Sequence, residues 1–155
     1  MSIRCEIVSQ DKSLFEGDVD IVIVPGSNGE MGILPGHAPL LATLGYGILR
    51  IRIKGEEQAF TIAGGVVEVR PDIVTVLADV GEDVEKIDIQ RAEAAKARAE
   101  ELLKRASPPD TDEYLSIQSA LRRSKIRLDA VRRFRPTRIL RPEKPIKDIE
   151  SEEEE

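Results

Sequence analysis

Apolar and charged residues alternate along short stretches in the first half of the chain. In residues 49–54, Leu, Ile and Ile alternate strictly with Arg, Arg and Lys, and residues 3–7 show a similar period of two. Such alternation places apolar side chains on one face of a β-strand and charged side chains on the other. Residues 21–24 and 73–77 are short runs rich in β-branched residues, which are typical of strands inside a sheet. The pattern therefore predicts β structure through residue 84.

Four clusters of turn-forming residues separate these strands. They lie at residues 26–29, 45–47, 54–55 and 70–72 and contain the Gly, Asn, Pro and Asp residues that tight turns favour. Short strands separated by turns at this spacing are typical of a sandwich or barrel. We therefore predict an all-β, antiparallel N-terminal domain over residues 1–84.

The hydrophobic period changes at Asp88, where a helical pattern begins. Small and apolar residues then recur at intervals of three and four among strong helix formers. These seam positions are Ala92, Ala95, Ala99, Leu102 and Ala106. The helix is predicted to end at Ser107, because the two prolines that follow supply no amide proton and disfavour a helical conformation in the preceding residue.

A second helical pattern follows the prolines. Either Asp110 or Thr111 can cap it, and Asp112 and Glu113 add favourable charge in its first turn. Its seam positions are Tyr114, Ile117, Leu121, Ser124, Leu128 and Val131. Two helices joined by a tight loop are predicted to pack as an antiparallel hairpin over residues 85–134, with a marginal mutual contact because both seams are narrow. The chain as a whole is thus predicted to be α+β.

Charge is distributed unevenly along the 155 residues, whose formal net charge is −6. Residues 1–86 carry a net charge of −7, residues 87–121 carry −2, residues 122–141 carry +8 and residues 142–155 carry −5. The chain thus combines an acidic body, a strongly basic segment and an acidic end. Three prolines and a terminal run of four glutamates favour a disordered tail over residues 135–155.

Composition excludes several kinds of functional site. His37 is the only histidine and Cys5 the only cysteine, so the sequence contains neither a disulfide pair nor a cysteine zinc cluster, and no metal site is expected. Aromatic residues make up 3% of the chain and tryptophan is absent, which leaves little for stacking nucleic-acid bases. The common zinc, redox and phosphate-binding motifs are absent. These features favour a binding or mechanical protein over an enzyme.

Three segments resemble the ε subunit of F-type ATP synthases. They are residues 29–40 (Gly-Glu-Met-Gly-Ile-Leu-Pro-Gly-His-Ala-Pro-Leu), residues 64–71 (Gly-Gly-Val-Val-Glu-Val-Arg-Pro) and residues 87–92 (Ile-Asp-Ile-Gln-Arg-Ala). Their order and spacing match the family over residues 1–134, and the first segment is highly specific. The resemblance implies a ten-stranded β-sandwich followed by a two-helix hairpin, with no required cofactor and no catalytic activity of its own.

The resemblance also implies partners and a location. The sandwich is expected to dock on the γ subunit and the c-ring, with His37 at the γ contact and Glu30 facing the ring, and so to couple proton-driven rotation to ATP synthesis. The alternative is that glycines and prolines in this segment simply shape a connection between strands. No stretch approaches the roughly 18 apolar residues of a membrane span, and no targeting signal is evident. We therefore expect a peripheral protein on the cytoplasmic side of a bacterial cell membrane, held there only through the complex.

The basic segment matches the family's inhibitory helix. In the family the hairpin can extend along γ, where its second helix meets an acidic motif on the catalytic β subunits and resists ATP hydrolysis. The matching cations are Arg122, Arg123, Lys125, Arg127, Arg132 and Arg133. Because the basic block contains one acid among ten charges, it cannot neutralise itself, and an acidic protein surface would attract it. The alternative is a solvated face, on which exposed ion pairs are worth about 0–1 kcal/mol each.

Some family members hold ATP in the folded hairpin, so the resemblance implies ATP as a regulatory ligand. The matching positions are Glu82, Ile87, Asp88, Arg91, Ala92, Arg98, Arg123 and Arg127. Arginines spaced by seven or by four share a helix face, and two such pairs could surround a triphosphate with charge-assisted hydrogen bonds. The alternative is local, with Asp88 as a helix N-cap and the arginines paired with neighbouring glutamates. Since no phosphate-cradling glycine loop is evident, binding without hydrolysis is expected.

Two other functions compete with this interpretation. The +8 block favours a nucleic-acid-binding module, although the acidic body and the scarcity of aromatic residues argue against one. A free-standing sandwich adaptor whose helices serve only for self-association is the second alternative. Salt-dependent affinity for duplex DNA would support the first, and a stable dimer with no affinity for γ would support the second.

Overall fold

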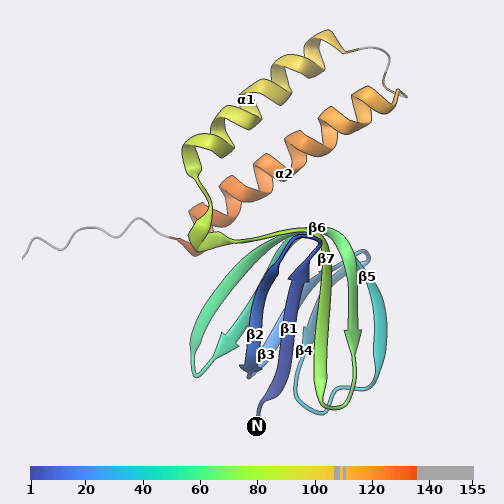
Figure 1. Cartoon of the computed structure of the whole chain (residues 1–155), viewed down its shortest axis with the longest axis vertical. Helices are drawn as coiled ribbons and strands as arrows, with labels where there is room; N and C mark the ends of the chain where they lie inside the picture. The colour runs from blue at the N-terminus through green and yellow to red at the C-terminus, as the bar shows by residue number, and fades with distance from the viewer. Residues whose placement is uncertain (107–108, 110, 136–155) are drawn as a thin grey trace, which may run out of the picture.

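The computed structural model describes residues 1–106, 109 and 111–135, and shows a β domain followed by two antiparallel helices (Figure 1). The strands are β1 (Ile3–Ser9), β2 (Ser13–Val19), β3 (Ile21–Gly26), β4 (Gly29–Ile33), β5 (Leu40–Ile53), β6 (Glu56–Val69) and β7 (Ile73–Asp83). A short 3₁₀ helix, η1 (Val84–Lys86), leads into α1 (Ile89–Arg105), and α2 (Asp112–Phe134) follows. The predicted α+β class is confirmed. Most of the predicted tail, residues 136–155, lies outside the described residues.

The strands form one curved sheet of seven strands in the order β2-β1-β7-β6-β5-β3-β4, whereas about ten strands were expected. The number differs because β5 and β6 each continue for 14 residues. The turn predicted at residues 45–47 is wrong, since these residues lie inside β5. Gly64 and Gly65 in β6 have φ of +80° and +129°, and a Cβ on Gly65 would collide with the Leu77 carbonyl oxygen. Glycine therefore lets these long strands bend where a side chain would collide.

One strand pair departs from the predicted antiparallel arrangement. β1 runs parallel to β7, with Cys5 opposite Val74 and Ile7 opposite Val76, whereas the other pairs are antiparallel. A tight turn forces two consecutive strands to be antiparallel, but β1 and β7 are connected through the rest of the domain. Their relative direction is therefore set by how the sheet curves, which local sequence does not encode.

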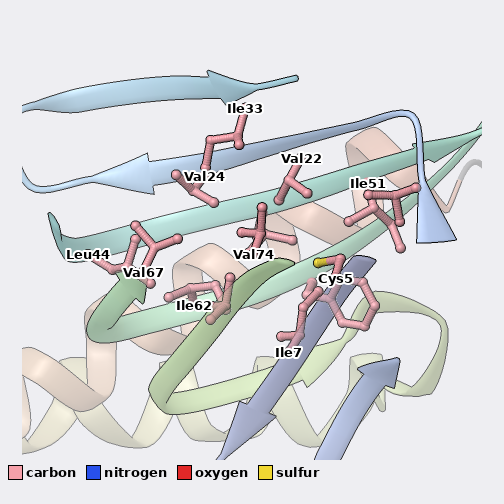
Figure 2. Packing of buried hydrophobic residues seen from close by; sticks show 14 of the residues in the cluster. Cys5, Ile7, Val22, Val24, Ile33, Leu44, Ile51, Ile62, Val67 and Val74 are labelled. Carbon is pink, nitrogen blue, oxygen red and sulfur yellow. The ribbon is translucent and has the colours of Figure 1, made fainter. Parts of the chain in front are cut away.

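The main core lies inside the curved sheet, where side chains from several strands converge (Figure 2). Leu49 and Ile51 are buried and the next charged residue, Arg52, is exposed, as the alternating pattern predicted. Phe15 and Phe60 contact each other edge to face with their ring centroids 6.3 Å apart. Cys5 is fully buried, and burial raises the pKa of its thiol to about 12. This thiol therefore stays protonated and acts as a small apolar core group.

A second, smaller core joins the helices to the sheet. Its buried members come from β6, the hinge and both helices, and they are Ala59, Val84, Ile87, Ala92, Ala130 and Val131. Among the main contacts between elements, α2 packs against β5, β6 and η1, whereas α1 packs against α2. Five of the six buried members are Ala or Val, so the hairpin is attached to the sheet through little apolar area. Polar contacts consequently matter for holding it.

The caps of the helices resolve two alternatives left open by the sequence. The side chain of Asp88 accepts a hydrogen bond from the Arg91 amide and caps α1, and the side chain of Thr111 accepts one from the Tyr114 amide and caps α2.

Leu102, predicted to lie in the apolar seam of α1, is 43% exposed. The seam is therefore narrower toward the tip of the hairpin than its spacing indicated.

Candidate nucleotide site and subunit surfaces

Six of the eight predicted ATP-binding residues meet at the hinge between sheet and hairpin. A pocket of about 240 Å³ is lined by Glu82, Lys86, Ile87, Asp88, Arg91, Ala92 and Arg127. These residues come from the end of β7, from η1, from the start of α1 and from the second half of α2. The pocket is slightly smaller than the roughly 300–1,000 Å³ of typical small-molecule sites, so it can enclose only part of a nucleotide.

An ion pair crosses this pocket from α2 to the sheet. Arg127 Nε lies 2.8 Å from Glu82 Oε2, and both side chains are about one third exposed. The same Glu82 oxygen is buried and has no hydrogen-bond partner among the described residues, although the Arg127 charge lies beside it. A buried acceptor without a hydrogen bond is unfavourable, so it would gain from a ligand that brings an N–H or O–H donor.

The start of α1 shapes the other side of the pocket. Asp88 Oδ1 accepts a hydrogen bond of 3.1 Å from the Arg91 amide, so the local alternative of an N-cap is correct for Asp88. Ile87 and Ala92 are 3% and 2% exposed and anchor this turn in the second core. The exposed Arg91 is thereby held at the rim of the pocket, where its guanidinium can reach an anion.

Two of the predicted nucleotide residues do not line this pocket. Arg98 is an exposed residue of α1, about 10 Å further along the helix axis than Arg91. Arg123 lines a neighbouring small cavity against β6 and β7, together with Arg127. The structure instead adds Lys86, which sequence reasoning missed because only the motif that begins at Ile87 was considered. With Lys86, Arg91 and Arg127 facing two carboxylates, the pocket carries a net positive charge.

Arg135, predicted to belong to the tail, fastens the end of α2 to the hinge. Its Nη1 donates to the backbone oxygens of Val84 at 3.2 Å, Glu85 at 3.1 Å and Ile87 at 2.9 Å. Its own amide donates to the Val131 oxygen and so ends the helix. These contacts join residues about 50 positions apart, which no local sequence pattern reveals. Arg135 is thus a clamp across the base of the hairpin.

The cations predicted for the inhibitory helix have different surroundings in this folded hairpin. Arg122 stacks 4.4 Å from the centre of the Tyr46 ring, and Arg127 pairs with Glu82. Arg132 and Arg133 both pair with Asp129 on the same helix. Arg123 and Lys125, the other two predicted cations, make no ion pair with the described residues. Part of the basic surface of α2 is therefore occupied by the sheet, and part is free.

Glu30 lies on β4 beside the end of α2. Its carboxylate accepts a hydrogen bond of 2.7 Å from Arg50, whose guanidinium lies 6.0 Å from the centre of the Phe134 ring. A groove of about 350 Å³ here is shared by the sheet and α2 and is lined by Glu30, Arg50, Arg133 and Phe134, among others. The Glu30 side chain is 58% exposed, so it stays accessible to a partner.

His37 lies in the connection between β4 and β5. Its amide donates to the Leu34 oxygen at 3.1 Å, and Gly36 has a φ of +80°, as a type II turn with Pro35 in its second position requires. The imidazole Nδ1 donates to the Ala38 oxygen at 2.7 Å and leaves Nε2 available. The glycines and prolines therefore do shape this connection, and they hold the ring in a defined orientation.

Two exposed leucines flank the same connection, and sequence reasoning did not single them out. Leu34 is 57% exposed and Leu41 is 72% exposed. Leu41 also lines a groove of about 450 Å³ that includes Glu30 and the β3–β4 turn. Large apolar side chains left in water beside polar ones are characteristic of surfaces that another protein covers.

The part of the chain that the structure describes, residues 1–106, 109 and 111–135, lacks two kinds of feature. This part of the chain contains no cluster of three or more His, Cys, Asp or Glu residues that could hold a metal ion. None of its helices is long and apolar enough to cross a bilayer.

Family profiles match the chain along most of its length. The profile described as ATP synthase, Delta/Epsilon chain, beta-sandwich domain matches residues 2–84, and the one described as ATP synthase, Delta/Epsilon chain, long alpha-helix domain matches residues 85–132. The ATP synthase epsilon chain of Bacillus licheniformis is 42% identical over 131 residues, which are 84% of this chain and 98% of that relative. The epsilon chain of Pelotomaculum thermopropionicum is 48% identical over 100 residues, which are 64% of this chain and 75% of that relative.

Solved structures show the same fold. A chain in the Euglena gracilis mitochondrial ATP synthase assembly of OSCP, F1 and c-ring matches with a TM-score of 0.69 and 24% identity, covering 84% of this chain and 81% of that one. A chain in the central stalk and c-ring assembly of Tetrahymena thermophila mitochondrial ATP synthase matches with a TM-score of 0.58 and 15% identity, covering 84% of this chain and 96% of that one. At these identities the likeness concerns the fold.

Proposed function

The chain belongs to the ATP synthase delta/epsilon chain family, and from this membership we propose that it is the epsilon subunit of a rotary ATP synthase. It acts as a structural and regulatory subunit of the central stalk, whose partners are the γ subunit, the c-ring and the catalytic β subunits, and it catalyses nothing itself. The observation that carries the proposal is the pair of adjoining family matches over residues 2–132. Neither a nucleic-acid module nor a free-standing adaptor accounts for that combination.

In this proposal, the surface around the β4–β5 connection contacts the γ subunit and the c-ring. It combines the exposed leucines 34 and 41, the oriented imidazole of His37 and the accessible carboxylate of Glu30. Apolar contacts supply the area, while the two polar side chains fix the register. On the c-ring side, Glu30 would meet cationic or polar loops and exchange its contact with Arg50 for one in the complex.

Replacing Glu30 and His37 together by alanine is expected to weaken binding to the γ subunit and c-ring by about tenfold, equivalent to about 1.4 kcal/mol. The isolated fold should melt as before, because the Glu30 side chain is largely exposed and its pair with the half-buried Arg50 is worth at most about 1 kcal/mol. Binding is measured by titrating the stalk and ring with the labelled subunit. Replacing Glu56, at the start of β6, and Asp72, between β6 and β7, controls for general surface changes, because both residues are exposed. Unaltered affinity in the first variant would remove the interface assignment.

Inhibition of ATP hydrolysis is the second part of the proposal. In the folded hairpin, Arg122 and Arg127 contact the sheet, so α2 presents only part of its positive charge. Release of the hairpin would free these two arginines for an acidic surface on the catalytic β subunits. Electrostatic attraction then sets how readily the extended helix is captured.

Replacing Lys125 and Arg132 by glutamine is expected to raise ATP hydrolysis by the reconstituted complex roughly 3- to 10-fold, because each lost cation weakens capture by about 0.3–0.7 kcal/mol. Both side chains are exposed, so the folded hairpin should be preserved. Replacing Lys104 and Arg105 near the end of α1 removes the same charge and serves as the matched control. Equal hydrolysis by both variants would contradict the assignment of α2 as the inhibitory helix.

Regulation by ATP follows from the hinge pocket. The proposal is supported by its three cations, by the buried Glu82 oxygen that lacks a hydrogen bond, and by the convergence of the hinge with both helices. A nucleotide bound there would contact α1, α2 and η1 at once, and would therefore stabilise the folded, non-inhibiting hairpin. Ile87 and Ala92 shape the site, while Arg91 and Arg127 would hold the phosphates.

The location of the protein follows from the same membership. A peripheral subunit of a membrane-bound rotary enzyme needs no membrane span of its own. Its relatives in Bacillus licheniformis and Pelotomaculum thermopropionicum are bacterial. We therefore place the subunit at the bacterial cell membrane, on the cytoplasmic side, where ATP is available to the hinge pocket.

A further inference from the structure

One face of α2 is positively charged and mostly open to solvent, although its Arg122 also stacks on the Tyr46 ring of β5. We call it the cationic face, and it consists of Arg122, Lys125, Arg132 and Arg133, all of which are exposed. The buried side chains of α2, Ser124, Ala130 and Val131, lie on other sides of the helix. Asp129 is the one acidic residue within the described part of this stretch, and it already serves both Arg132 and Arg133. The cationic face therefore keeps an excess of about three positive charges.

The chain itself carries a complementary charge. Residues 142–155 have a net charge of −5, and the stretch 148–155 contains six acidic residues and no basic one. From the cationic face and this complementary segment, we infer that residues 142–155 dock on the cationic face of α2. The occupant is thus a segment of the same chain, and no second molecule is required.

The geometry of attachment favours this docking. The Arg135 clamp fixes the chain at the end of α2, within one helical turn of Arg132 and Arg133, and the acidic segment begins seven residues later. Arg122, the most distant member of the face, lies 13 residues back along the helix, or about 20 Å. The 17 residues from Arg135 to Glu152 can span up to about 55 Å, so the glutamates reach the whole face. Tethering gives the segment an effective concentration in about the millimolar range.

Docking of this kind would act on the same cations that inhibition needs, and this consequence rests on the proposed function. The acidic segment would shield α2 from other acidic surfaces, so the helix would be captured only when the segment is displaced. Individual exposed ion pairs are weak, but six acids tethered beside four cations act together. The docking is accordingly expected to be strong at low ionic strength and to vanish when salt screens it.

The first test places a nitroxide label at residue 155 by the substitution Glu155→Cys in the full chain. Native Cys5 is fully buried, so it should not react with the label. Amide NMR signals of residues 122–133 are expected to broaden at about 0.1 M salt, where the Debye length is about 10 Å, and to recover at about 1 M, where it is about 3 Å. Broadening spread evenly over the protein, or concentrated on another surface, would overturn the inference.

Charge variants distinguish this docking from a general charge effect. Replacing the glutamates at 152–154 by glutamine should abolish the broadening, whereas neutralising three exposed acids elsewhere should preserve it. The control acids are Asp11, Asp72 and Glu93. If both variants behave alike, the inference fails.

An independent measurement uses an oligoglutamate peptide as a probe for the cationic face. The chain shortened to residues 1–141 is expected to bind this peptide about tenfold more tightly than the full chain, because its own acidic segment no longer competes. Equal affinities would overturn the inference. Both measurements use the isolated protein, so the docking can fail while the role in the rotary complex stands, and the reverse also holds.

Discussion

Replacing Arg135 by alanine is expected to lower the protection of α2 amides against hydrogen exchange by about 30- to 100-fold, equivalent to about 2–3 kcal/mol. Hydrogen bonds from a charged donor contribute about 1.5–3 kcal/mol each, and here one guanidinium nitrogen shares its protons among three backbone oxygens. The hairpin is otherwise held by a small core of mostly alanine and valine and by a partly exposed ion pair. The Arg135 clamp therefore contributes a large part of the free energy that keeps the hairpin folded onto the sheet.

Matched variants make this expectation specific. Arg132→Ala removes an arginine from the same turn of α2. The Arg132 side chain is 80% exposed and pairs with Asp129 on the same helix, so this substitution should change the protection of α2 by less than about 1 kcal/mol. Arg135→Lys keeps the charge and one or two of the bonds and should restore protection in part. Global melting of the β domain should stay unchanged. Equal protection in the Arg135→Ala and Arg132→Ala variants would show that the clamp does not hold the hairpin.

The behaviour of the clamp also explains how the hairpin can be both ordered and releasable. Its acceptors are backbone oxygens of the hinge, so breaking it exposes polar groups that water can satisfy. Releasing a hairpin that is held by apolar contacts alone would cost more free energy, because its apolar side chains would become exposed to water. The sheet, by contrast, is built on a core of larger fully buried side chains, including Phe60, Leu49 and Ile51. Release of α2 should accordingly leave the sheet intact.

Secondary structure followed from the sequence wherever a local pattern decides it. Alternation identified β1 and the second half of β5, and the predicted turn at residues 54–55 exists because Lys54 and Gly55 both adopt positive φ, as a two-residue hairpin requires. The glycines at 45–47 were mistaken for a turn. Glycine provides freedom to turn but does not dictate it, and in β5 pairing with β6 on one side and β3 on the other keeps the chain extended.

Properties that depend on distant parts of the chain could not be predicted in the same way. The parallel pairing of β1 with β7 depends on how the whole sheet curves. In the hinge pocket, residues 87–92 were predictable because they form one continuous motif, and the family resemblance brought in Arg127. Lys86 and Arg135 were missed because each gains its role only when the hinge meets the end of α2.

Replacing Arg91 and Arg127 together by alanine is expected to reduce the affinity of the isolated protein for ATP at least about 100-fold, because two charge-assisted contacts to phosphate are lost. Isothermal titration calorimetry measures this affinity directly. Arg127→Ala also leaves Glu82 unpaired, so Arg91→Ala alone is a needed second variant: Arg91 is exposed, and its loss disturbs no ion pair among the described residues. Replacing Lys104 and Arg105 removes equal charge outside the pocket and should have little effect.

The position of Arg98 sharpens this expectation further. It lies outside the pocket, so Arg98→Ala should weaken ATP binding only a few-fold. Bound ATP at about a hundredfold excess over its Kd should stabilise the folded hairpin by roughly 2.7 kcal/mol, which offsets the loss expected from Arg135→Ala. Adding ATP to that variant should therefore restore the protection of α2, while the Arg91 and Arg127 double variant should gain none. Absence of heat at millimolar ATP with the native protein would end the nucleotide proposal and leave the stalk function unaffected.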